Sequence, residues 1–271
     1  MTIFIYKLIA IITMLFDHMG DSFFGNNMVM RCVGRFAFPC YAFMLAEGFR
    51  HIRSSEKRIS SHAAKLVVLA FVSEFCYDLL ECGFDLSRYM ASQNNIITLL
   101  LAFVGLIATE KWKGQPVTIA CVYFLTAFLN YACGSNYRFV GVLLVYAFYW
   151  YLNLVMEGDS TQIAAGNHFR LNNQQRPMYD YGKRLMILLG ITVVYIPLYH
   201  WARFNFTVGV EYITQFVHYL PWYITHIAIA ALLAMYNGQV GYKAKWFGTF
   251  YSWFYPAHLL LLGIIKIAFV S

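Results

Sequence analysis

The chain has 271 residues, of which 60% are hydrophobic, 19% aromatic and only 12% charged. Soluble domains have about 45–50% apolar and about 25% charged residues, so this composition excludes a soluble enzyme and a disordered scaffold. The net charge of +7 would suit nucleic acid, but the mean hydropathy of +0.55 and apolar runs of about 20 residues predict an all-α, polytopic membrane bundle.

Taken in chain order, the segments that are long and apolar enough to span a membrane are 3–20, 29–49, 63–82, 95–110, 117–132, 139–157, 185–203, 219–237 and 246–269. This gives about nine transmembrane helices, and because several segments are short or polar, eight is the alternative. The connections are brief except for 158–184, a polar stretch containing EGDSTQ and NNQQRP. We find no internal repeat, and therefore predict a single transmembrane domain over 1–271.

The basic residues predict the orientation of these spans. With nine spans, one side of the membrane receives Arg50, Arg53, Lys57, Arg58, Lys65, Lys111, Lys113, Arg170, Arg176, Lys183, Arg184, Lys243 and Lys245. The opposite connections contain Arg88, Arg138 and Arg203, with Arg31 at the edge of a span. The positive-inside rule therefore places the N-terminus and the 158–184 loop in the cytoplasm. Because the positive charge is explained by orientation, we predict no nucleic-acid partner.

Ionisable residues inside the spans are the main functional candidates, because each costs roughly a few kcal/mol at membrane depth. The direction of each span sorts them into two layers. The outer layer contains Asp17, His18, Arg35, Asp78 and Asn94. The inner layer contains Lys7, Glu47, Arg50 and His51, next to the basic segment with Lys57 and Arg58. Glu74 and Asp78 are four residues apart and share one helix face.

Lys7 and His18 are eleven residues apart, which places them within roughly 20° of the same helix face and about 16 Å apart along the axis. Such a stripe suits coenzyme A, which has phosphates at one end and a long arm ending in a thioester. The adjacent Asp17 leaves the helix about 100° away from His18. We therefore expect His18 to point inward and Asp17 to pair with a cation of another span, such as Arg35.

Each candidate also has a structural interpretation. His18 could lie at the membrane interface, and Arg35 could serve only to neutralise a carboxylate. Glu47 could mark a helix end, and the basic segment 50–65 is first of all an orientation signal. His258 follows a proline and could fill a helix kink with a hydrogen bond.

Several motifs resemble those of the TraX family, the F-pilin acetylases, within the transmembrane acyltransferases. They are KLIA…MLFDH at 7–18, GRFAFP at 34–39, LAEGF at 45–49, SE…YD at 73–78, QN…TL at 93–99, GVLL at 141–144 and FYPAHLL at 254–260. The motifs cover both ends of the chain, and the region 150–245 contains none. Transmembrane acyltransferases often begin with a basic residue followed eleven positions later by histidine, as Lys7 and His18 are. Where the family tends to have an Asp-Tyr pair, this chain has Asn136 and Tyr137, which puts pilin in doubt as the acceptor.

The resemblance implies a bacterial inner-membrane acetyltransferase that uses cytosolic acetyl-CoA, without a metal, and an acceptor near the outer face, with an amine favoured over a hydroxyl. The predicted catalytic residues are His18 as general base, Asp17 and Arg35. The predicted donor-binding residues are Lys7, Glu47, Arg50, His51, Lys57 and Arg58. The predicted acceptor-binding residues are Glu74, Asp78, Asn94, Asn95, Tyr255 and His258. Arg35 or the amides of Asn94 and Asn95 would stabilise the negative charge that develops on the thioester oxygen.

The alternative function is a secondary transporter or channel whose His, Asp and Glu cluster binds a solute or a proton. Transporters often contain inverted repeats, and none is visible here. The sequence leaves open whether the acceptor is pilin or another peptide, a sugar, a lipid or a small molecule. It also leaves open the acyl length, direct transfer against an acetyl-histidine intermediate, and the oligomeric state.

Overall fold

The computed structural model describes residues 1–89, 92–164 and 176–269, and side chains at 1–89, 92–155 and 181–269. These residues form an all-α structure. The helices are α1 (Ile3–Ser22), α2 (Met28–Gly34), α3 (Ala37–Ile52), α4 (Glu56–Cys82), α5 (Asn95–Lys111), α6 (Pro116–Ala132), α7 (Arg138–Ala164), α8 (Arg176–Arg203), α9 (Gly209–His218), α10 (Leu220–Ala234) and α11 (Lys245–Phe269), with a short 3₁₀ turn η1 (Leu86–Arg88).

Each predicted span coincides with a helix or with a pair of consecutive helices. Among the described residues, five helical segments are long and apolar enough to cross a membrane: α1, the α2–α3 pair, parts of α7 and α8, and α11. A sixth arises if α9 and α10, which meet at a bend of 64°, form one span. Helices α5 and α6 have only 17 residues each. The prediction of an all-α membrane protein is therefore confirmed, while the count of nine and the cytoplasmic N-terminus stay predictions.

Several predicted boundaries are wrong because helices continue beyond their apolar runs. Helix α4 begins at Glu56, so Lys57, Arg58 and Lys65 lie on a helix and not in a loop. Likewise, α7 and α8 extend into the predicted 158–184 loop, of which 165–175 lies outside the described residues. Helix α9 was not predicted. Hydropathy marks only the part of a helix suited to hydrocarbon, whereas backbone hydrogen bonds continue into polar flanks.

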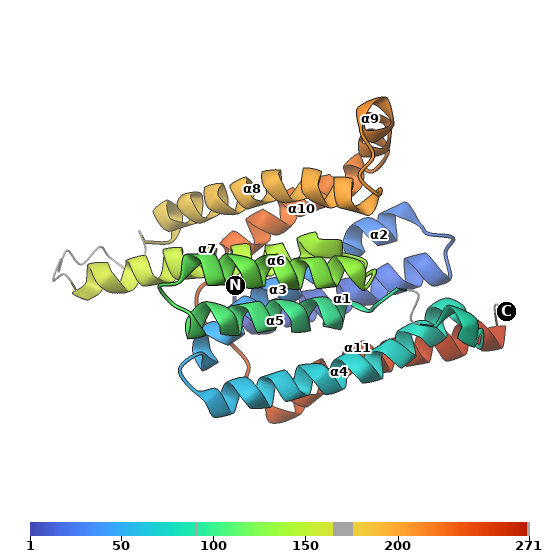
Figure 1. Cartoon of the computed structure of the whole chain (residues 1–271), viewed down its shortest axis with the longest axis horizontal. Helices are drawn as coiled ribbons and strands as arrows, with labels where there is room; N and C mark the ends of the chain where they lie inside the picture. Colours follow the sequence, from blue (N-terminus) through green and yellow to red (C-terminus); the bar gives the residue numbers. More distant parts are fainter. Residues whose placement is uncertain (90–91, 165–175, 270–271) are drawn as a thin grey trace.

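Apart from α9, which stands across it, the longer helices run roughly along the long axis of the molecule in three groups (Figure 1). Helices α1, α3, α5, α6 and α7 form the centre, with α8 and α10 packed on one side and α4 and α11 on the other. Aromatic side chains fill much of the core, including the fully buried Phe43, Phe103 and Tyr149. We call the end of the bundle with Lys57 and Arg58 the basic end, and the opposite end the His18 end.

The α2–α3 segment is broken at the His18 end by the pair Arg35 and Phe36. Just before the break, Gly34 lies against α1 so closely that an added Cβ would be 2.3 Å from the Cβ and Oδ1 atoms of Asp17. No side chain fits in that space. Gly34 therefore allows the contact of α1 with α2 that brings Arg35 beside Asp17.

The Gly34→Ala variant is expected to unfold at a temperature several degrees lower than the parent, because overpacking costs about 1–3 kcal/mol. The matched control is Gly190→Ala in α8, where an added Cβ would have no atom within 4 Å. Thermal unfolding in detergent measures both. Equal stability of the two variants would contradict this account of the α1–α2 contact.

Candidate functional site

A large cavity with a volume of about 380 Å³ lies where α1, α3, α4, α5 and α11 meet. Most of its wall is apolar. The polar residues toward the basic end are Lys7, Glu47, His51 and His62. The residues toward the His18 end are Tyr41, Ile96, Leu99 and Tyr255. The cavity thus extends from the predicted inner layer toward the His18 end.

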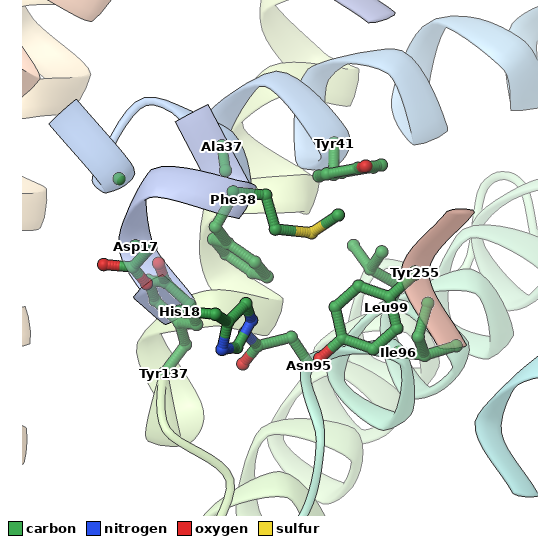
Figure 2. A pocket seen from close by; sticks show the side chains of 12 residues that line it. Asp17, His18, Ala37, Phe38, Tyr41, Asn95, Ile96, Leu99, Tyr137 and Tyr255 are labelled. Carbon is green, nitrogen blue, oxygen red and sulfur yellow. The ribbon is translucent and has the colours of Figure 1, made fainter. Parts of the chain in front are cut away.

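A second, small cavity of about 30 Å³ adjoins it at the His18 end and is lined by Asp17, His18 and Asn95. The two cavities share four wall residues: Tyr41, Ile96, Leu99 and Tyr255. Figure 2 shows the His18 imidazole and the Asn95 amide side by side in this space. The space suffices for one or two water molecules. Because the four shared residues stand between the cavities, they form a constriction.

A third cavity of about 390 Å³ opens at the basic end and is lined by Lys57, Arg58, Lys65 and His62. His62 also lines the large cavity. The three spaces therefore form a series, from a basic surface, through an apolar interior, to a buried imidazole.

His18 is buried, with 7% of its surface exposed, and its ring lies 5.2 Å from the ring of His258 and 6.4 Å from that of Tyr255. The Nδ1 atom of His258 is 2.8 Å from the carbonyl oxygen of Phe254. A carbonyl oxygen only accepts, so Nδ1 donates, and the Nε2 atom of neutral His258 carries a lone pair. This Nε2 atom is buried without a hydrogen-bond partner. Two imidazoles therefore lie beside each other at the end of the cavity series.

Asp17 is turned away from His18, as the helix geometry predicts, and forms ion pairs with two arginines. Its carboxylate accepts from Arg35 at 2.9 and 3.1 Å and lies 3.2 Å from Arg31. Arg35 is 4% exposed and also donates to the Tyr199 hydroxyl at 3.4 Å. These contacts hold Arg35 at the His18 end. Arg35 directly follows Gly34, which lines the small cavity.

At the basic end, Glu47 is 2% exposed and accepts three hydrogen bonds. The donors are Arg50 at 2.8 Å, His51 at 3.1 Å and the Tyr236 hydroxyl at 2.7 Å. Burial and the neighbouring Glu47 raise the pKa of Tyr236, which keeps its hydroxyl a donor. Arg50 also donates to Asn153 at 3.0 Å. Glu47 thus anchors the inner end of α3 as well as lining the large cavity.

The predicted donor-binding residues divide among these spaces. Lys7, Glu47 and His51 line the large cavity, and the Lys7 ammonium lies 4.8 Å from the Tyr251 ring centre. Lys57 and Arg58 line the basic cavity. Arg50 is not among the lining residues of these cavities.

The predicted acceptor-binding residues also separate. Asn95 and Tyr255 line the small cavity, with His258 next to His18. Asn94 instead donates to Glu74 through its backbone and side chain, and caps α5 by accepting from Ile96. Asp78 lies one turn beyond Glu74, buried on the same helix. The small cavity beside His18 is not lined by Asn94, Glu74 or Asp78.

Sequence reasoning missed several lining residues, among them Tyr41, His62, Lys65, Tyr137 and Tyr251. Tyr251 had a detectable signal, because positions 251, 255 and 258 are spaced for one helix face. Tyr41 and Tyr137 had no such spacing from a recognised residue. No group of three or more metal-ligating side chains occurs among the described residues.

The family described as TraX protein matches residues 4–165, which is more than half of the chain. This range contains Lys7, His18, Arg35, Glu47 and Asn95, and excludes Tyr255 and His258. No curated protein and no solved structure matches the chain.

Replacing Asp17 with Asn is expected to destabilise the protein by about 3–5 kcal/mol, because breaking a buried ion pair leaves the Arg35 charge uncompensated. Its control is Glu56→Gln, which removes an exposed carboxylate from the first turn of α4. Thermal unfolding in detergent is again the measurement. If the two variants lose the same stability, the ion pair does not hold α1 to the α2–α3 break.

Proposed function

The chain belongs to the TraX family, and on this premise we propose that it is a membrane acetyltransferase with His18 as its general base. It moves an acetyl group from acetyl-CoA to an amine, or alternatively a hydroxyl, at the His18 end. The observation that carries the proposal is the series of cavities that joins a basic surface to a buried histidine.

The donor fits this series by its chemistry. Lys57, Arg58 and Lys65 offer three cations for the phosphates of coenzyme A. The apolar wall of the large cavity suits the thin pantetheine arm, and Lys7 and His51 lie where the arm would enter. The thioester would then reach the constriction formed by Tyr41, Ile96, Leu99 and Tyr255.

Proton transfer follows from the two imidazoles. An amine arrives as ammonium and loses one proton to His18, and the free nitrogen lone pair attacks the thioester carbonyl carbon. The tetrahedral intermediate then loses a second N–H proton, for which His258 Nε2 is the neighbouring acceptor. The carbon–sulfur bond breaks, and the thiolate takes the proton held by His18. One proton remains in excess and leaves to solvent.

In this proposal, Asn95 stabilises the oxyanion of that intermediate. Its side chain lies beside His18 in the small cavity (Figure 2). Asn94 already donates a hydrogen bond to Glu74, and Arg35 donates to Asp17, so Asn95 is the remaining amide in this group. An amide N–H directed at the developing negative charge lowers the barrier, and removing one such donor costs about 10²–10³ in kcat.

The central test is acetyl-CoA turnover by purified His18→Ala, measured as free coenzyme A thiol. We expect a loss of about 10²–10⁴-fold, the usual contribution of a general base, with acetyl-CoA binding retained. His218→Ala, at an exposed histidine of α9, is the control and is expected to keep full activity. Unchanged turnover by His18→Ala would eliminate this mechanism.

The donor site is tested separately by Lys57→Ala and Arg58→Ala. Each is expected to raise KM for acetyl-CoA by about tenfold, equivalent to about 1.4 kcal/mol, with little change in kcat. Lys113→Ala removes an exposed cation from the α5–α6 connection and serves as the control. A fall in kcat at unchanged KM would place the phosphates elsewhere.

A further inference from the structure

Three guanidinium groups surround one buried indole at the His18 end. The Trp222 ring centre lies 4.6 Å from Arg35, 4.9 Å from Arg203 and 5.7 Å from Arg31. The groups come from separate parts of the chain: α2, the α2–α3 break, the last residue of α8 and the start of α10. The cluster is thus produced by tertiary packing and not by one helix face.

The positive charges in this cluster exceed their carboxylate partners. Asp17 serves both Arg35 and Arg31, and Asp21 lies 3.5 Å from Arg31. Arg203 donates to the Tyr199 hydroxyl at 3.3 Å, and in the part of the chain that the structure describes it has no carboxylate within ion-pair distance. One guanidinium of the cluster therefore lacks a counter-charge.

Two hydrogen-bond donors in the cluster are also unused. The indole Nε1 of Trp222, a residue only 1% exposed, and the Nε of Arg31 are buried without a partner. An unpaired buried donor costs about 1–3 kcal/mol, and three cations around one ring repel each other. A bound oxyanion would reduce both costs, since guanidinium groups bind carboxylates and phosphates through paired N–H donors.

The cluster adjoins the cavity of His18. Asp17 and Tyr137 line that cavity, and the Tyr137 ring stacks on Tyr199 at 5.7 Å. The Tyr199 hydroxyl in turn accepts from both Arg35 and Arg203. Only this layer of side chains separates Arg203 from the proposed reaction centre.

We infer that Arg203, Arg31 and the Trp222 indole bind an oxyanion group of the acceptor, so that the acceptor is an amine or hydroxyl compound bearing a phosphate or carboxylate. The acceptor part of this inference rests on the proposed function, whereas oxyanion binding does not. A phospholipid headgroup also carries a phosphate, so the experiments below distinguish a lipid from an acceptor as the source of the bound oxyanion.

Binding is tested by tryptophan fluorescence of the purified full-length protein in uncharged detergent, titrated with inorganic phosphate at constant ionic strength. We expect a saturable change that is absent in Trp222→Phe and at least tenfold weaker in affinity in Arg203→Gln. Arg88→Gln, which removes an exposed arginine beside α4, is the charge-matched control and is expected to bind like the parent. Arg203→Lys keeps the charge and loses the paired donors, so we expect its phosphate affinity to lie between those of the parent and Arg203→Gln. It provides a second, milder variant. No saturable change, or parental affinity in both Arg203 variants, would overturn the site.

The acceptor class is tested with a matched pair of amines, O-phosphoethanolamine and ethanolamine, by release of coenzyme A from acetyl-CoA. We expect kcat/KM to be at least tenfold higher for the phosphorylated amine, with this preference lost in Arg203→Gln. Equal use of the two amines, or coenzyme A release that neither amine increases, would overturn the acceptor assignment. Absence of any coenzyme A release while phosphate still binds would count against the proposed function alone.

The lipid source is tested in phosphatidylcholine nanodiscs with and without phosphatidylglycerol. A fluorescence change that requires phosphatidylglycerol and does not occur with inorganic phosphate would assign the cluster to lipid headgroups and overturn its role in acceptor binding. A response to phosphate in both kinds of nanodisc supports the inference.

Discussion

The ion pair between Asp17 and Arg35 is the contact on which the His18 end depends. Its 2.9 Å separation requires α1 and α2 to approach until only a glycine fits at position 34. Each partner also brings other groups into place, since Asp17 contacts Arg31 and Arg35 contacts Tyr199 and Trp222. A buried pair of this kind adds little net stability over apolar packing, but it penalises any arrangement that separates its members. The geometry around His18 therefore depends on this ion pair as well as on apolar packing.

The proposed donor route combines two environments that a coenzyme A thioester needs. Cations at Lys57, Arg58 and Lys65 remain exposed, where binding them to phosphates costs little desolvation. Beyond His62 the walls become mostly apolar, and the space at the far end holds only one or two water molecules. Electrostatic interactions are stronger in such a dry site, so a single amide such as Asn95 has a larger effect there than at the surface.

Much of the layered arrangement could be predicted from sequence, because helix periodicity and span direction fix both depth and face. The separation of Asp17 from His18 follows from helix geometry. Span direction places Asp17 and Arg35 in one layer, and the structure shows that Arg35 is a cation that pairs with Asp17. Which of the adjacent residues Asn94 and Asn95 lines the small cavity could not be predicted. The outcome depends on which of the two side chains caps α5, and Asn94 does so. Trp222 and Arg203 lie in a region without recognisable motifs, and packing of α10 against α2 and of α8 against α10 brings them to Arg31 and Arg35. The extent of α4 was missed because hydropathy does not register its charged first turns.

The constriction at Tyr41, Ile96, Leu99 and Tyr255 also bears on leakage through the membrane. A hollow that ran uninterrupted from one leaflet to the other would let ions pass. The junction of the two hollows is lined by four bulky side chains, two of them tyrosines whose hydroxyls are buried without a hydrogen-bond partner among the described residues. A narrow junction of this kind admits a thin chain of atoms and slows the passage of hydrated ions.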